Sequence, residues 1–149
     1  MSGWKCHGGQ SQIWRIHEVG MHGPWHKYMM QKHGISKYVP VHTAAESANS
    51  LTESTAFMDL AWGKNEWGTE IWGWNGDTAA GAANDHQLWH FESADPYDRN
   101  IVWIKKTRTK LVVELVGASV ENGTRIEGYF LRPIEENRKE QMWKITVVG

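Results

Sequence analysis

The middle of the chain carries a carboxylate, an indole, an amide and an imidazole, on Asp59, Trp74, Asn84 and His86. A carboxylate accepts two hydroxyl hydrogen bonds at once, and its charge makes them stronger than neutral ones. An indole face stacks on C–H groups, and an amide or imidazole fixes orientation because it both donates and accepts. A sugar presents vicinal hydroxyls on one side and C–H bonds on the other, so it calls for this combination of side chains.

Asn84 and His86 come just before a Gln-x-Trp triplet, and this triplet occurs three times in the chain. The triplets are Gln12-Ile13-Trp14, Gln87-Leu88-Trp89 and Gln141-Met142-Trp143. Tryptophan buries a large ring but needs a partner for its N–H, so it accumulates in cores with polar seams and in binding sites. The three triplets therefore indicate a repeated structural unit.

A longer repeat surrounds the second and third triplets. The segment "FMDLAWGKNEWGTEIWGW" (57–74) aligns with "VVELVGASVENGTRIEGY" (112–129) at a constant offset of 55 residues. Each copy holds an acid, a Gly-Thr turn and a Gly-aromatic pair, followed by its Gln-x-Trp triplet. The opening "GWKCHGGQSQIW" supplies Gly3-Trp4 and the first triplet but no acid. Because a repeat fixes the architecture, we expect two complete units and an incomplete first one.

The expected elements are short strands. No segment keeps an apolar helical stripe with caps at both ends. Segments rich in β-branched and aromatic residues alternate with Gly, Asn and Asp clusters, which predicts an all-β sandwich or barrel. These segments are "TAFMDLAW", "TEIWGW", "QLWHFE", "NIVWIKK", "KLVVELV", "TRIEGYF" and "QMWKITVV".

On these motifs the chain resembles the ricin B-type (R-type) β-trefoil lectins, and within them the mushroom agglutinins. The residues that carry the resemblance are "MDL…GTEIWGW…NDHQLW". It covers residues 54–149, covers 3–19 in part and fits 20–53 poorly. The family's fold implies three repeats of four strands, half of them in a six-stranded barrel and half in a triangular cap. It also implies that each triplet is mainly scaffold: the tryptophan fills the shared centre, and the glutamine ties neighbouring backbone and helps to orient a ligand.

The resemblance predicts a single domain over residues 1–149 with an irregular opening. Residues 1–19 are a partial first repeat, 20–53 an atypical insertion or replacement strands, 54–93 the second repeat and 94–149 the third. Trp14 and Leu60 are 46 residues apart, whereas Trp89 and Leu115 are 26 apart. The extra residues either supply strands, as "HKYMMQKH" and "SKYVPVH" could, or form a surface insertion; a truncated chain is a third alternative. Two complete repeats and two strands of the first repeat give ten of the twelve strands that the fold requires. A barrel lacking two strands has exposed edges, which favour a homodimer.

The site residues that the resemblance implies fall in the second and third repeats. The expected carbohydrate-binding set is Asp59, Trp74, Asn84, His86 and Gln87. A possible second site in the third repeat consists of Glu114, Tyr129, Asn137 and Gln141. The third repeat is the weaker candidate. Asn84 lies three residues before Gln87, but the residue three before Gln141 is Arg138, and Asn137 lies one residue further from the glutamine. In the first repeat Trp4 and Gln12 remain, but Gly9 replaces the asparagine and no acid precedes them.

Composition excludes several other classes of function. A net charge of −1 gives no electrostatic footprint for nucleic acid or an anionic membrane, and no apolar run approaches the length of a membrane helix. Cys6 is the only cysteine, so no intramolecular disulfide forms. The start "MSGWKCHGGQ" has no signal pattern, so we expect a cytoplasmic protein, released if at all by a non-classical route.

Catalytic and metal sites are also weakly supported. His22 and His26 have a helical metal-ligand spacing, but Gly23-Pro24 breaks such a helix and no acid or cysteine completes the set, so we expect polar loop histidines. Cys6 lacks a nucleophile motif. The acidic pairs Glu135-Glu136 and Asp95 with Asp98 sit in turn-rich segments near prolines, where a solvated surface is expected rather than a glycosidase pair. No enzyme activity, cofactor or metal is predicted.

The resulting expectation is a non-catalytic lectin. The resemblance implies galactose or N-acetylgalactosamine-type glycans on glycoproteins or glycolipids as ligands. Two alternatives remain open. One is a trefoil protease inhibitor or protein-interaction module that presents residues 20–53. The other is the targeting module of a pore-forming or enzymatic toxin, although no effector domain fits beside a trefoil in 149 residues.

Overall fold

The structure is a computed structural model of the chain, and it describes most of residues 2–147. The described ranges are 2–3, 13–32, 56–78, 85–119, 121–133, 135–136 and 138–147. Predictions for Trp4, Gln12, Asn84, Asn137 and residues 33–53 lie outside these ranges. Within them the regular elements are strands and single 3-10 turns, with no α-helix, so the predicted all-β class is confirmed.

In the described ranges, ten antiparallel strands and four short 3-10 turns position the candidate site. The strands are β1 (Ser2–Gly3), β2 (Trp14–His22), β3 (Trp25–Lys32), β4 (Ala56–Leu60), β5 (Thr69–Asn75), β6 (Trp89–Ser93), β7 (Ile101–Lys106), β8 (Leu111–Leu115), β9 (Thr124–Phe130) and β10 (Trp143–Lys144). The turns are η2 (Ala61–Gly63), η4 (Asp85–Gln87), η5 (Val116–Ala118) and η6 (Lys139–Gln141).

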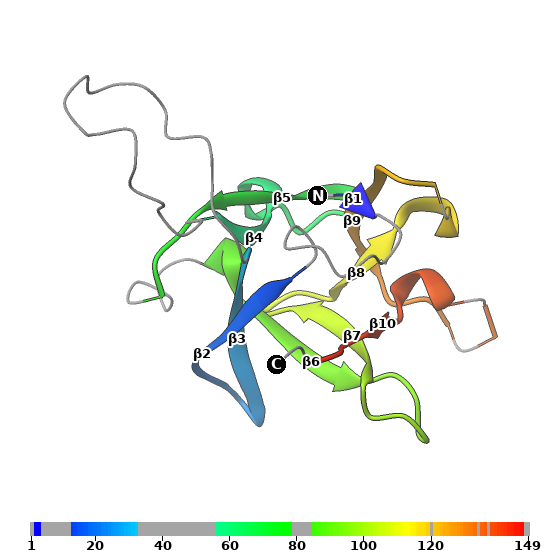
Figure 1. Cartoon of the computed structure of the whole chain (residues 1–149), viewed down its shortest axis with the longest axis horizontal. Helices are drawn as coiled ribbons and strands as arrows, with labels where there is room; N and C mark the ends of the chain where they lie inside the picture. The colour runs from blue at the N-terminus through cyan, green and yellow to red at the C-terminus, as the bar shows by residue number, and fades with distance from the viewer. Residues whose placement is uncertain are drawn as a thin grey trace.

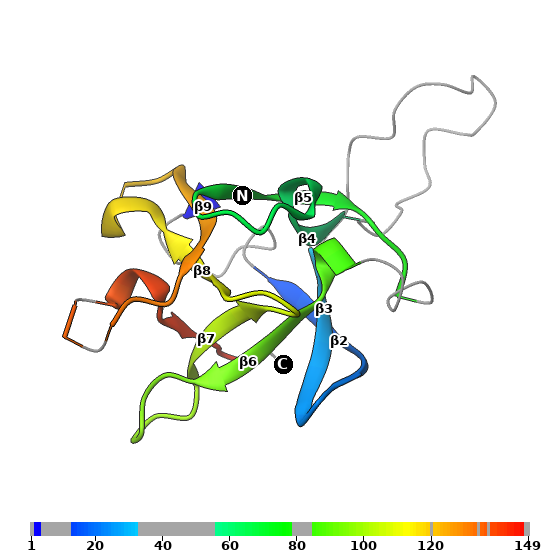
Figure 2. The ribbon, with the colours of Figure 1, turned by 180° about the vertical axis from the view of Figure 1, so that it is seen from behind.

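Seven of the strands close into a ring of pairings. The order around it is β9, β5, β4, β3, β6, β7, β8 and back to β9. Closure removes the exposed edges that we expected of a barrel lacking two strands, so that expectation is wrong for the described strands and lends no support to the predicted homodimer. The strands β1, β5 and β9 gather at one end of the molecule, and the hairpins β2–β3 and β6–β7 extend at the other (Figures 1 and 2). One apolar cluster fills the ring, made of Met30, Met58, Leu60, Ile71, Trp89, Leu111, Val113 and Ile126.

The predicted 55-residue repeat is visible in the strand registers. Asp59 pairs with Trp72 across β4 and β5, and their counterparts Glu114 and Glu127 pair across β8 and β9. The turns η2 and η5 that follow β4 and β8 are also equivalent. The first repeat joins the pattern through Gly3, which pairs with Thr124 as Gly128 pairs with Thr69. Gly3 therefore takes the place that the sequence alignment assigned to it.

The hairpin β2–β3 is the first-repeat counterpart of β6–β7. Trp14 pairs with Lys32 as Trp89 pairs with Lys106, and β3 joins β4 as β7 joins β8. Within the irregular segment 20–53, residues 25–32 are thus a strand of the ring, and residues 33–53 lie outside the described ranges.

The two spaced histidines lie in this same hairpin, so their prediction as loop residues is wrong. His22 ends β2 and His26 is in β3, on either side of the Gly23-Pro24 turn. Gly23 has φ +57, which glycine adopts without steric cost. The two-residue turn joins β2 directly to β3, so both histidines lie in strands.

Candidate functional site

The glutamines of the second and third triplets tie a carboxylate to neighbouring backbone. The Gln87 amide nitrogen donates to Asp59 Oδ2 and to the Asn75 carbonyl, both at 3.0 Å. The Gln141 amide nitrogen donates to Glu114 Oε2 at 2.7 Å and to the backbone carbonyl of Phe130 at 2.8 Å. Both glutamines are fully buried. The predicted scaffold role of the glutamine is confirmed in these two repeats.

The predicted place of the triplet tryptophans in the shared centre is confirmed for Trp89 and met in part by the other two. Trp89 is fully buried and donates from Nε1 to the Met58 carbonyl at 3.0 Å. Trp143 repeats this bond to the Val113 carbonyl at 2.9 Å. Trp143 and Trp14 are partly buried and pack against the central cluster.

Asp59, the carboxylate expected to bind the ligand, is enclosed. It lies in β4 with only 3% of its surface exposed. Its Oδ1 accepts a hydrogen bond from Trp72 Nε1 at 3.0 Å, while Oδ2 accepts from Gln87. A carboxylate has about four acceptor sites, so capacity remains, but a ligand hydroxyl can reach it only if a neighbouring side chain moves. In this conformation Asp59 holds Trp72 and Gln87 in place.

Trp72, which bonds to this carboxylate, contacts two further tryptophans, and we call the three the aromatic corner: Trp62, Trp72 and Trp74. Trp74 is 55% exposed and stacks on Trp72, with centroids 5.4 Å apart and planes 24° apart. Trp62 is 70% exposed and meets Trp72 edge-on, at 5.6 Å and 70°. Exposed indoles beside hydrogen-bonding groups form a surface that can stack on C–H groups.

The backbone of Trp62 is left-handed, which is rare for a bulky residue. Its φ is 56° and its ψ 14°, a conformation that costs a non-glycine residue about 1 kcal/mol or more. The equivalent residue of the third repeat is Gly117, with φ 63°. Sequence reasoning missed Trp62 and Trp72, yet the repeat alignment held the signal, because it sets these tryptophans against Gly117 and Glu127.

His86 completes the group. A Cβ placed on Gly63 would lie 2.6 Å from the His86 ring, so the ring packs directly against this glycine, next to Trp62 in the chain. His86 itself is exposed. The structure therefore brings together Asp59, Trp74, His86 and Gln87, while Asn84 lies outside the described residues.

A buried lysine lies behind the site. Lys106 is 3% exposed, donates to the Thr107 carbonyl at 3.1 Å and lies 5.9 Å from the centre of the Trp89 ring. Burial lowers the pKa of Lys106 from 10.5 to about 8, an effect partly offset by the charges of Asp85 and Asp59. The folded chain therefore loses this proton at a lower pH than the unfolded chain.

This lysine predicts a rise of stability with pH. Between about pH 7.5 and about pH 9.5 the unfolded state binds more protons at Lys106, so the free energy of unfolding should increase by about 2 kcal/mol. Urea unfolding of wild type and Lys106→Met across this range measures the effect, since the variant lacks the titrating group. Parallel pH profiles for the two proteins would contradict it.

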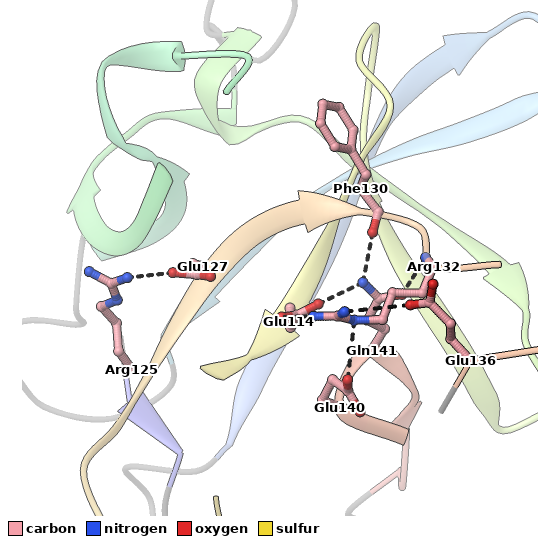
Figure 3. Close-up of polar contacts among 8 residues, drawn as sticks. All are labelled: Glu114, Arg125, Glu127, Phe130, Arg132, Glu136, Glu140 and Gln141. Carbon is pink, nitrogen blue, oxygen red and sulfur yellow. Dashed lines mark hydrogen bonds and ion pairs between the residues drawn. The ribbon is translucent and has the colours of Figure 1, made fainter. Parts of the chain in front are cut away.

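In the third repeat, Arg132 fills the equivalent site (Figure 3). Its Nη2 donates to Glu114 Oε1 at 3.0 Å, and its guanidinium carbon lies 4.8 Å from the centre of the Tyr129 ring. Two more carboxylates approach the guanidinium: Glu140 Oε1 at 3.2 Å from Nε, an ion pair without hydrogen-bond geometry, and Glu136 Oε2 at 3.7 Å from Nη1. The bond to Glu114 is the main cause of a raised Arg132 pKa.

The predicted second site is thus occupied by the chain itself. Glu114, Tyr129 and Gln141 do come together, and Asn137 lies outside the described residues. Arg132 supplies both interactions expected of a ligand, a hydrogen bond to the carboxylate and contact with the aromatic face. Glu127, at the position of Trp72, bonds instead to Arg125 at 2.5 Å (Figure 3). At the corresponding place in the second repeat stands Asp77, so that site has no such arginine.

The described residues contain no group of three or more histidine, cysteine or acidic side chains placed to hold a metal ion. In the same ranges no helix has the length and apolarity needed to cross a membrane.

Comparison with known proteins supports the fold. No protein-family model matches the sequence, and no curated protein matches it. Among solved structures, the chain is similar to a designed threefold-symmetric protein, ThreeFoil, with a TM-score of 0.67 and 13% sequence identity over 97% of this chain and 79% of that one. At this identity the likeness concerns the fold alone. Together with the closed ring and the repeated registers, it supports an all-β trefoil.

Proposed function

We propose that this chain is a non-catalytic lectin of the ricin B type, similar to the mushroom agglutinins, with its binding site in the second repeat. The ligands are galactose or N-acetylgalactosamine-type glycans on glycoproteins or glycolipids. One observation carries the proposal: Trp74 is more than half exposed and stacks on Trp72, whose indole N–H bonds to the buried Asp59–Gln87 pair. An apolar face next to hydrogen-bonding groups suits a ligand that has both C–H faces and hydroxyls.

Each residue of the site has a distinct part in this proposal. Trp74 stacks on the C–H face of the sugar, and the exposed His86 imidazole exchanges hydrogen bonds with its hydroxyls. Asp59 acts by holding Trp72 and Gln87 in place, through bonds of 3.0 Å to each. Asn84 remains a predicted contributor.

Affinity at such a site is expected to be low. A single shallow sugar site reaches about millimolar affinity, near −4 kcal/mol. Since Arg132 covers the aromatic ring of the third-repeat site, the second repeat is, of these two, the one that exposes its aromatic ring. Strong attachment to a cell surface therefore requires several chains, because linked sites raise avidity by roughly 10² to 10⁴. A homodimer is the simplest such assembly.

The decisive comparison uses two equivalent aromatic residues. Trp74→Ala should weaken galactose binding about tenfold, the loss of one stacking contact. Tyr129→Ala removes the matching ring of the third repeat, which already faces Arg132, and should leave binding unchanged. Titration calorimetry and ligand-observed NMR with galactose and N-acetylgalactosamine measure both. A wild-type protein that binds neither sugar and no glycan on an array would overturn the proposal.

The protease-inhibitor alternative depends on residues 20–53 as a presented loop. In the described part of this segment, residues 25–32 form β3 within the ring. Protease inhibition by a protein that binds no glycan would favour this alternative.

A further inference from the structure

Trp62 has a conformation that the fold does not require of a tryptophan. It adopts φ 56°, a region that favours glycine, and the third repeat places Gly117 there with φ 63°. With 70% of its surface exposed, Trp62 gains little from burial. The turn uses left-handed backbone in both repeats, so the fold explains the conformation but not the choice of a bulky tryptophan for it. A residue that bears such strain without need is typical of functional positions.

The surroundings of Trp62 give its ring a defined orientation relative to the proposed site. The Trp72 ring is fixed by its bond to Asp59 and is nearly parallel to Trp74, at 24°. Trp62 contacts the same ring at 70°. The plane of Trp62 is therefore steeply inclined to that of Trp74. Trp72 thus contacts both Trp74 and Trp62, and the two outer indoles of the aromatic corner are set at a steep angle to each other.

We propose that Trp62 is a specificity-determining residue that makes the aromatic corner select a disaccharide terminus over a single sugar. This inference rests on the proposed lectin function. In this inference one pyranose stacks on the Trp74 indole, and the sugar linked to it contacts the Trp62 indole. A second C–H face on a second indole adds a stacking contact that a monosaccharide cannot make. The second indole also explains why the repeat departs from glycine at this position.

The test replaces Trp62 by the residue of the equivalent repeat. Wild type should bind lactose or melibiose about tenfold more tightly than galactose, the gain from one further aromatic contact. Trp62→Gly should lose that preference and keep galactose affinity within about twofold of wild type. Its melting temperature should stay the same or rise, because glycine relieves the left-handed strain. Trp67→Ala is the matched control, since this tryptophan is 63% exposed but packs on Tyr129 and Phe130.

The outcomes separate the inference from the function on which it rests. A Trp62→Gly protein that keeps the disaccharide preference, or loses galactose and disaccharide equally, overturns the role of Trp62. So does a lower melting temperature, which would mean that the indole serves folding, and so does an equal effect from Trp67→Ala. If wild type binds none of the three sugars, the proposed function itself fails.

Discussion

Trp89→Ala is expected to lower the free energy of unfolding by about 4 kcal/mol, the largest effect that we predict. The indole is fully buried in the ring, and its N–H donates to the Met58 carbonyl at 3.0 Å. Alanine leaves a cavity and removes the donor to the Met58 carbonyl. It also removes the indole over which the Lys106 ammonium lies. Urea unfolding followed by far-ultraviolet circular dichroism measures the loss.

The equivalent tryptophan of the third repeat is the matched control. Trp143 makes the same bond, to the Val113 carbonyl, but is only partly buried. Its replacement by alanine should cost about 2 kcal/mol, because less surface leaves water. Equal losses of stability for Trp89→Ala and Trp143→Ala would contradict the prediction that the more deeply buried tryptophan contributes more.

Arg132→Ala is expected to lower the free energy of unfolding by about 3 kcal/mol. The Glu114 side chain is only 4% exposed, and the variant leaves it without its cation. Removing one partner of a buried ion pair leaves an uncompensated charge, which costs more than the pair contributes. Glu136 and Glu140, which also face the guanidinium in Figure 3, add repulsion once it is gone.

A double variant tests this explanation. Arg132→Ala combined with Glu114→Gln should recover much of the lost stability, because the glutamine removes the uncompensated charge. The Gln141 amide nitrogen can still donate to the new side-chain oxygen. Chemical unfolding of the single and double variants gives the coupling energy. Additive losses would mean that the Arg132–Glu114 contact does not cause the cost.

Much of the scaffold could be predicted because its signals are local and recur. An acid, a Gly-Thr turn and a Gln-x-Trp triplet at a fixed spacing mark the same strands in each copy. Gly68 and Gly123 illustrate this, since both turns use glycine at positive φ, 77° and 85°. The tertiary bonds of Gln87 and Gln141 then follow, as equivalent positions on equivalent strands share their neighbours.

The candidate site was less predictable, because side chains there compete for the same partners. The spacing of Asp59 and Trp74 indicated a carboxylate beside an aromatic platform, but it could not show that Trp72 would take one carboxylate oxygen. Nor could composition show that Arg132 would cover Tyr129, since this contact depends on how the chain after β9 folds back.

The order of residues alone predicts an all-β chain built from a repeated unit, whose second repeat carries a carboxylate, an indole and an imidazole at fixed spacing. These features follow from which residue types recur at which intervals. Which side chains are exposed became known from the folded structure, which buries Asp59 and Lys106, exposes Trp62 and Trp74, and places Arg132 in the third-repeat site. Exposure and hydrogen-bond partners depend on packing between strands that are distant in the chain, and no local pattern records that packing.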